Sequence, residues 1–227
     1  MFEPELLTDE SLRELALTLA LRDADLARIH LDFGCPPLWR RRTGFATLVH
    51  IILEQQVSLL SARSMLNRLK GRVVPFTPER FCELGEKFLR ENGVTRQKAS
   101  YIIHLATLIT TKQLKLATLS QMSDAEARRA LMEVKGIGSW SADVYLLMAM
   151  RRPDIWPAGD LALAIALRDL KGLPEIPPPD VLEELAEGWR PHRAVAARML
   201  WHFYLERKAA ARASNQGKKI KAATSRL

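Results

Sequence analysis

The apolar residues of this chain recur at the spacing of a helix in one segment after another. No segment alternates clearly between apolar and polar residues, and only 71–76 is a candidate for extended chain. The sequence therefore predicts an all-α fold of roughly ten helices. Three segments carry the i, i+3, i+4, i+7 pattern of one helix face: Phe45, Leu48, Val49 and Ile52; Ala62, Met65, Leu66 and Leu69; and Ala99, Ile102, Ile103 and Ala106.

Helix start signals support the same fold class. Thr77 precedes a proline, a pair typical of a cap followed by the first helical position. Ser123 and Glu126 have the spacing of a capping box. Further helices are expected to begin near Asp180, after three prolines, and near His192, the last of them ending near Arg207.

Charge is concentrated at the C-terminal end. The chain has 227 residues, a hydrophobic share of 48% and a net charge of +8. Subtracting the six basic side chains of residues 208–227, which include no acidic residue, leaves +2 for the rest. An anionic partner such as nucleic acid is indicated, but this segment lacks an apolar face and is also typical of a solvated tail without fixed structure. The six are Lys208, Arg212, Lys218, Lys219, Lys221 and Arg226.

Several classes of protein are disfavoured by the sequence. No apolar run reaches the roughly 18 residues that a membrane span needs, and the acidic start MFEPELLTDE does not read as a signal peptide. Two cysteines, Cys35 and Cys82, cannot supply a disulfide framework or the four thiolates of an iron–sulfur cluster. No His/Cys cluster has the spacing of a zinc site. We therefore expect no membrane partner and no iron–sulfur cluster.

The segment Leu131–Tyr145 predicts two helices joined by a tight turn. Two glycines separated by one apolar residue allow positive φ and close backbone approach, and the amides that open the second helix favour a phosphate. The apolar residue, Ile137, would fill the space between the helices, and two serines could add hydroxyl donors. An ordinary turn between helices with a glycine cap has the same pattern. The candidate DNA contacts are Gly136, Ile137, Gly138, Ser139 and Ser141.

Together, Val134–Asp143 (VKGIGSWSAD) and Pro157–Asp160 (PAGD) resemble the signature of the helix-hairpin-helix (HhH-GPD) DNA glycosylase superfamily. Within it the chain looks most like the 3-methyladenine DNA glycosylase II branch, in a compact form. The resemblance spans about residues 42–206. Three further segments carry it: Phe45–Ser58 (FATLVHIILEQQVS), Val94–Ala99 (VTRQKA) and Glu187–Ala196 (EGWRPHRAVA).

This resemblance implies two helical lobes with a cleft between them. Residues 43–158 would form the middle lobe, which ends with the hairpin. Residues 1–42 and 159–207 would form the second lobe, and 208–227 a basic, flexible tail.

Asp160 is the candidate catalytic residue. From the local sequence alone, a cap on the helix that follows is the simpler interpretation. The resemblance implies the catalytic role, because Asp160 lies on the position of the family's aspartate. A carboxylate facing the sugar stabilises the positive charge that develops when an N-glycosidic bond breaks. The preceding residue, Gly159, departs from relatives that often have an acidic residue or proline there.

The resemblance places two tryptophans, Trp140 and Trp201, in the base pocket, where an aromatic wall would attract a cationic alkylated base. Core packing is the alternative for both. Bifunctional members carry a lysine at the position of Trp140, so the expected reaction is hydrolysis without a lyase step. Val144 and Leu161 stand where other family pockets have aromatic residues.

By the same resemblance, Gln56 aligns with the side chain that fills the gap left by a flipped base; a helix terminator is the alternative. The family's hairpin also binds a monovalent cation, Na⁺ or K⁺, through backbone carbonyls. Here the matching carbonyls belong to Met132, Val134 and Gly136. No cofactor is expected to be required.

The expected function is that of a monofunctional DNA-3-methyladenine glycosylase, acting on double-stranded DNA with alkylated bases. Two alternatives stay open: a bifunctional glycosylase/lyase for oxidised bases, and a DNA-binding module without catalysis. We expect a monomer in the cytoplasm of a bacterium or the nucleus of a eukaryote.

Overall fold

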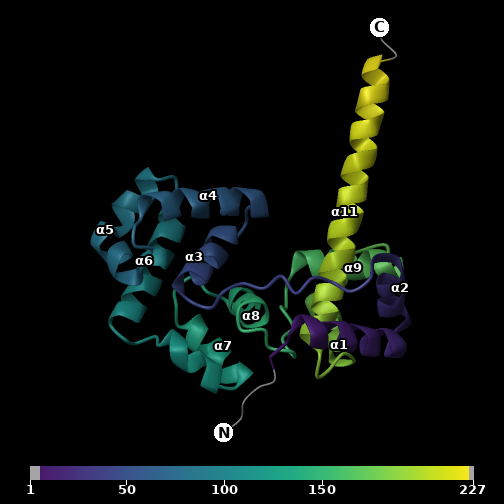
Figure 1. The fold of residues 1–227 in the computed structure, drawn as a ribbon, viewed down its shortest axis with the longest axis horizontal. Helices are drawn as coiled ribbons and strands as arrows, with labels where there is room; N and C mark the ends of the chain where they lie inside the picture. The colour runs from purple at the N-terminus through teal and green to yellow at the C-terminus, as the bar shows by residue number, and fades with distance from the viewer. Residues whose placement is uncertain (1–5, 225–227) are drawn as a thin grey trace. The chain divides into compact units, whose positions relative to one another are not determined.

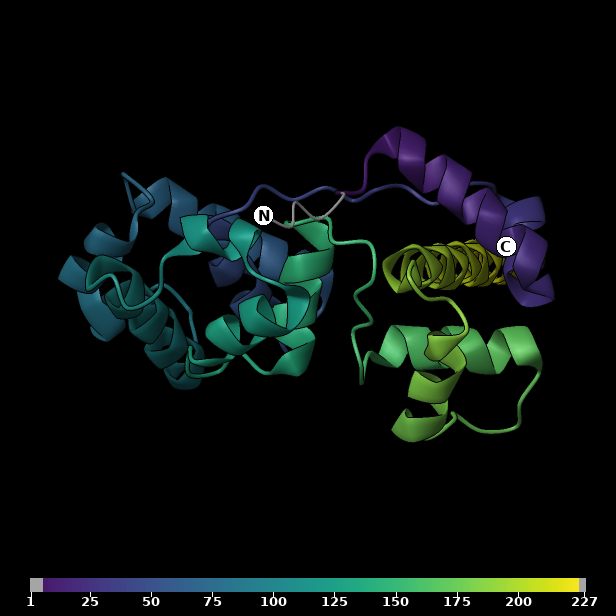
Figure 2. The same cartoon turned by 90° about the horizontal axis from the view of Figure 1, so that it is seen from below.

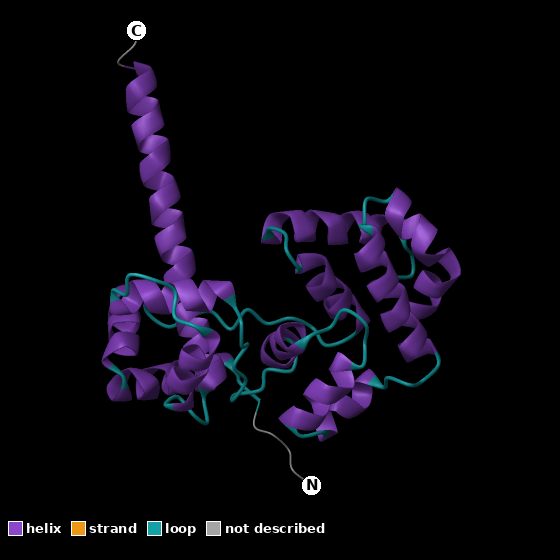
Figure 3. Cartoon of the chain, turned by 180° about the vertical axis from the view of Figure 1, so that it is seen from behind, coloured by secondary structure: helices purple, strands orange, loops and turns teal. Residues whose placement is uncertain are grey.

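The computed structural model describes the backbone of residues 6–224 and the side chains as far as residue 213. Within this range the chain forms eleven α-helices and one 3₁₀ helix, with no strand (Figure 3). The all-α prediction is confirmed for these residues. The elements are α1 (Asp9–Arg22), α2 (Ala24–Phe33), α3 (Phe45–Glu54), α4 (Leu59–Arg72), α5 (Pro78–Glu91), α6 (Arg96–Thr110), η1 (Leu116–Gln121), α7 (Asp124–Met132), α8 (Ser139–Met148), α9 (Leu161–Lys171), α10 (Pro179–Glu187) and α11 (Arg193–Thr224).

The helices belong to two compact units (Figure 1). One contains Leu6 and Trp39–Pro157, and therefore α3 to α8. The other contains Leu7–Leu38 and the chain from Ala158 onward, and therefore α1, α2 and α9 to α11. None of the helices between residues 6 and 224 combines the length and the apolar character that crossing a lipid bilayer requires.

The first unit is built around α3. Most residues of this helix are buried, as expected for a helix surrounded by others, and it packs on α4, α6 and α8. At its N-terminal end, Phe45 and Phe76 contact Phe81 edge to face, with ring centroids 5.1 and 4.8 Å apart. Such pairs add stabilisation beyond the area that they bury. This aromatic cluster therefore fixes the N-terminal end of α3 in the core of the unit.

The second unit is built around the first half of α11. In Figure 2 this helix is seen end on, between α1 and α2 on one side and α9 and α10 on the other. Residues Ala194–Ala197 of α11 are fully buried. Their small side chains let the neighbouring helices approach closely. The position of α11 at the centre brings its residues against the start of α9.

The caps read from the sequence are confirmed at two helices. Thr77 accepts a hydrogen bond from the backbone of α5, with proline at the first helical position. Ser123 and Glu126 form the predicted capping box at α7. Two details differ from prediction. Residues 71–76 contain no strand, because α4 continues to Arg72. The helix near Asp180 begins at Pro179, for which proline is well suited.

Helix α11 is longer than the sequence predicts. We expected it to end near Arg207 and residues 208–227 to have no fixed structure, but its backbone is helical to Thr224. Residues 225–227 lie outside the described part of the chain. The segment from Lys208 to Ala213 is rich in alanine with lysine and arginine, which are strong helix formers. Helical propensity therefore continues where the apolar face ends, and a reading based on apolar periodicity stops too early.

Candidate functional site

The hairpin connects α7 to α8 through the turn Glu133–Gly138. Helix α7 ends at Met132. Ile137 is buried between the helices, as expected, and its N–H donates a hydrogen bond to the carbonyl of Val134 at 2.9 Å. The turn is thus closed by its own backbone around one apolar side chain.

Gly136 is confined to glycine for two reasons. Its φ of 86° lies in the left-handed region that side chains disfavour. In addition, a Cβ at this position would lie 2.0 Å from Cδ2 of Tyr101 on α6. The Tyr101 ring therefore packs directly against the turn, and a side chain at position 136 would displace either the ring or the turn.

Of the two glycines that were expected to allow positive φ, Gly138 does not use this freedom. Its φ is −89°, and a Cβ here would meet open space. As the N-cap of α8 it offers no side-chain cap, and both Gly138 and Ser139 are exposed. The start of α8 is therefore open to an anion, which the helix dipole favours.

The two serines of the hairpin face different surroundings. Ser139 is exposed at the first position of α8. Ser141 is only 3% exposed, and its hydroxyl accepts a hydrogen bond from Gln55 Nε2 at 3.1 Å. Of the two predicted hydroxyl donors, only Ser139 lies at the surface, and Ser141 belongs to the packing of α8 on the end of α3.

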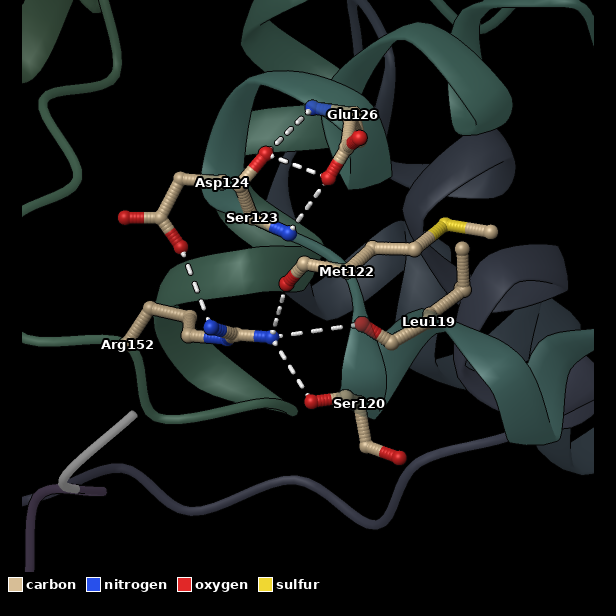
Figure 4. Close-up of polar contacts among 7 residues, drawn as sticks. All are labelled: Leu119, Ser120, Met122, Ser123, Asp124, Glu126 and Arg152. Atoms are coloured by element: carbon tan, nitrogen blue, oxygen red, sulfur yellow. Dashed lines mark hydrogen bonds and ion pairs between the residues drawn. The ribbon is translucent and has the colours of Figure 1, made fainter. Parts of the chain in front are cut away.

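A buried arginine holds the segment that leads into α7 (Figure 4). Arg152 donates from one terminal nitrogen to the carbonyls of Leu119, Ser120 and Met122 at 2.9–3.2 Å. Its other terminal nitrogen lies 3.4 Å from Asp124 Oδ1. Because Arg152 follows α8 and the carbonyls precede α7, this contact fastens the two helices of the hairpin at their far ends. Sequence patterns gave no sign of it.

Gln56 lies in the turn between α3 and α4. Its side chain is exposed and its φ is 56°, in the left-handed region where residues other than glycine are uncommon. The structure brings its neighbour Gln55 against the hairpin, a contact that the sequence analysis missed because polar residues at a helix end resemble ordinary caps.

The carbonyls proposed for a monovalent cation are partly engaged within the protein. The Val134 carbonyl accepts from Ile137 N–H, and the Gly136 carbonyl accepts from Gln55 Nε2 at 2.7 Å. A carbonyl oxygen has two lone pairs, so each keeps one for a further ligand, and the cation site stays a prediction. Within the part of the chain that the structure describes, no group of three or more His, Cys, Asp or Glu side chains could hold a metal ion.

In the second unit, Asp160 is the N-cap of α9. Its Oδ1 accepts a hydrogen bond from Leu163 N–H at 2.9 Å and a second from Trp201 Nε1 at 3.1 Å. The side chain is 9% exposed. The preceding Gly159 has a φ of 77°, where an acidic residue or proline of relatives would be strained or excluded. The carboxylate is therefore both a cap and a partner of one of the two predicted pocket tryptophans.

Trp201 lies on α11, and the turn of the helix that carries it is anchored by a buried arginine. Arg198, three residues earlier and on the same face of the helix, is fully buried and donates from Nε to the Leu38 carbonyl at 3.2 Å. Burial lowers the pKa of Arg198 to about 9. This contact fixes the turn of α11 that carries Trp201, so the direction of its indole toward Asp160 is set by the core of the unit.

The remaining pocket candidates have diverse surroundings. Trp140 is the second residue of α8 and is half-buried; it belongs to the unit of residues 39–157, whereas Asp160 and Trp201 belong to the other. Val144 is buried in the core, and Leu161 is 64% exposed beside Asp160. Of these two aliphatic positions, only Leu161 offers an apolar surface to a ligand.

Comparison with known proteins identifies relatives of this chain. DNA-3-methyladenine glycosylase 1 of Schizosaccharomyces pombe is 28% identical over 170 residues, covering 71% of this chain and 72% of that protein. DNA-3-methyladenine glycosylase of Bacillus subtilis is 28% identical over 169 residues. This match covers 69% of the chain but 56% of that enzyme, so the chain spans little more than half of its length.

A solved structure has the same fold. The crystal structure of DNA-3-methyladenine glycosidase from Bacillus halodurans superimposes with a TM-score of 0.73 and 26% identity, covering 84% of this chain and 88% of that one. The family model of the HhH-GPD superfamily base excision DNA repair proteins matches residues 49–191, a range that contains the hairpin, Gln56 and Asp160. The chain therefore belongs to the HhH-GPD superfamily of base excision DNA repair proteins.

Proposed function

We propose that this protein is a monofunctional DNA glycosylase that releases alkylated, cationic purines from double-stranded DNA and leaves an abasic site. The observation that carries the proposal is the Asp160 carboxylate, which is fixed at the start of α9 with the Trp201 indole on the same oxygen. Relatives named as DNA-3-methyladenine glycosylases support the substrate class.

The proposed reaction requires Asp160 to stabilise positive charge but not to protonate the leaving base. A purine alkylated at N3 or N7 carries a positive charge, so it departs with the electrons of the glycosidic bond as a neutral base and needs no proton donor. The deoxyribose left behind becomes electron-poor, and the carboxylate stabilises it electrostatically. A water molecule then forms the new bond to the sugar carbon and gives its proton to the carboxylate or to solvent.

The remaining candidates have roles around this step. The open start of α8 at Gly138 and Ser139 would hold a backbone phosphate, without reading sequence. Trp140 and Trp201 are each proposed as base-binding residues, and cation–π attraction of about 0.5–2 kcal/mol between an indole and a cationic base would favour an alkylated base. Gln56 would fill the gap in the base stack. Since Trp140 is not a lysine, no covalent link to the sugar is expected.

Two further properties are part of the proposal. The protein acts as a monomer, in the compartment that holds the DNA: the cytoplasm of a bacterium or the nucleus of a eukaryote. The hairpin carbonyls of Met132, Val134 and Gly136 would accept Na⁺ or K⁺, which would support the nearby phosphate; no step of the reaction depends on it.

The test is release of bases from methylated duplex DNA. The duplex is treated with a methylating agent and incubated with the protein, and the released bases are identified by mass spectrometry. We expect 3-methyladenine or 7-methylguanine, abasic sites in equal amount, and no covalent adduct after borohydride reduction. An adduct would identify a bifunctional lyase. Salt-sensitive DNA binding with no released base would identify a binding module.

A further inference from the structure

The turn that carries Gln56 is held from α6 by a lysine. Lys98 Nζ donates to the backbone carbonyls of Leu53 at 2.8 Å and of Gln55 at 2.7 Å. Carbonyls at the end of a helix have no partner within the helix, and a cation is favoured there by the helix dipole. Lys98 therefore acts as a C-terminal cap of α3 that is supplied by another helix, and it fixes the backbone that leads into Gln56.

The same turn is held from the hairpin by a glutamine. Gln55 Nε2 donates to the Gly136 carbonyl at 2.7 Å and to the Ser141 hydroxyl at 3.1 Å. An amide nitrogen carries two N–H groups, and both are directed at the hairpin. One end of Gln55 is thus fixed to α6 through its carbonyl, and the other end to the turn that is open to a phosphate.

Gln56 follows directly on this anchored residue. Its left-handed φ of 56° turns the chain sharply, and its side chain is exposed. A residue without glycine's freedom keeps such a conformation only where its surroundings enforce it. The contacts of Gln55 and Lys98 supply that enforcement, since they fix the peptide immediately before the turn.

We propose that Gln55 and Lys98 are positioning residues, here called the turn brace, which hold Gln56 at a fixed offset from the phosphate-binding turn at Gly136–Gly138. Phosphate contacts set the position of a protein along DNA. Because the turn brace fixes Gln56 relative to the hairpin, it also sets where the Gln56 side chain enters the base stack. The inference rests on the proposed function. A displacement of Gln56 by about 1 Å would cost up to about a hundredfold in rate.

Two variants remove the brace with little change of shape. Lys98→Met keeps the aliphatic stem and loses the donors. Gln55→Glu is isosteric and places carboxylate oxygens against the Gly136 carbonyl. The matched controls are Lys87→Met on α5 and Gln121→Glu in η1, both exposed and in the same unit. Lys98→Arg, which keeps donors for two carbonyls, is the conservative rescue. Thermal unfolding of every variant is measured first.

The decisive measurement is single-turnover release of 7-methylguanine from two substrates. In one the lesion is paired with cytosine; in the other it lies opposite an abasic site, where extrusion needs no opposing base pair to be broken. We expect the two brace variants to lose at least about tenfold on the paired duplex and at most about threefold on the unpaired one. Lys98→Arg and both controls should stay near wild type. An equal loss on both substrates, or no loss, overturns the proposal.

A second measurement separates the brace from the proposed function. The fluorescence of 2-aminopurine placed beside the lesion rises when the neighbouring base leaves the stack. If the wild-type protein releases no base but raises this signal, and Lys98→Met does not, the glycosylase proposal fails and the brace stands. If Lys98→Met raises the signal as wild type does, the brace is wrong. Affinity for undamaged duplex should be the same in all variants.

Discussion

The indole Nε1 of Trp201 donates a hydrogen bond to Oδ1 of Asp160 over 3.1 Å. The same oxygen accepts the backbone N–H of Leu163. A single carboxylate oxygen therefore joins the start of α9 to α11, and the candidate catalytic group is placed by two donors that come from the core of its unit. The first two predictions follow from this relationship.

Asp160→Asn should abolish excision without unfolding the protein. The amide oxygen of asparagine accepts the same two hydrogen bonds, so the cap and the contact to Trp201 persist, but the negative charge is lost. We expect the excision rate to fall at least about a hundredfold, as when one electrostatic contact to a transition state is removed. Single-turnover release of methylated bases measures the rate, and duplex binding should be unchanged. Excision within a few-fold of wild type would exclude the assigned role.

Trp201→Phe should reduce both stability and excision. Phenylalanine keeps an aromatic ring but removes the N–H, and a hydrogen bond to a charged group contributes about 1.5–3 kcal/mol. Urea unfolding measures this loss. The control is Trp189→Phe, because Trp189 Nε1 donates to Asp23 Oδ2 at 2.8 Å in the same unit. The control should lose similar stability and keep its excision rate; equal excision by both variants would count against a role for the indole at Asp160.

The two hairpin glycines should respond differently to alanine. Gly136→Ala places a methyl group against the Tyr101 ring at a left-handed φ, so we expect destabilisation of about 2–4 kcal/mol. Gly138→Ala meets open space at an ordinary φ and should cost less than about 1 kcal/mol. Chemical denaturation of both variants compares the two values. A larger loss at Gly138 would show that the turn is not built as described.

His50 should make folding sensitive to mild acid. Burial lowers its pKa from 6.5, and the nearby Arg41 acts in the same direction although Glu54 opposes it. The unfolded chain therefore binds the proton more readily than the folded one. The stability due to neutral His50 is complete above pH 6.5 and is lost as the pH falls through 6.5 toward the lower folded value.

The measurement is urea unfolding of the wild type and of His50→Gln, at about pH 8 and about pH 5. The wild type should lose more stability than the variant between these two conditions. A loss of equal size in both proteins would show that other groups are responsible for the acid sensitivity.

Much of the fold could be predicted because local signals agree with the final packing. The capping box at Ser123 and the threonine–proline pair before α5 depend on a few adjacent residues, and the periodic apolar positions of α3 and α6 report their buried faces. The end of α11 could not be predicted, since propensity without an apolar face gives no packing signal.

The candidate site was predictable only in part. Asp160, Trp140 and the two glycines lie in motifs that resemble a known family, so they could be named from the sequence. Gln55 and Lys98 could not, because their contacts join α3, α6 and the hairpin, which are far apart along the chain. Their residue types are equally common on solvated helix ends, so only the packed structure distinguishes them.

The buried arginine that follows α8 has a consequence for how the sequence of this protein can change over time. Arg152 binds main-chain carbonyls of Leu119, Ser120 and Met122, which every amino acid supplies. The hydrogen bonds themselves therefore place no demand on the side chains at these three positions, although Leu119 is also buried in the core. No side chain other than that of arginine presents so many donors in one plane. A saturation library of this segment should tolerate most replacements at Ser120 and almost none at Arg152.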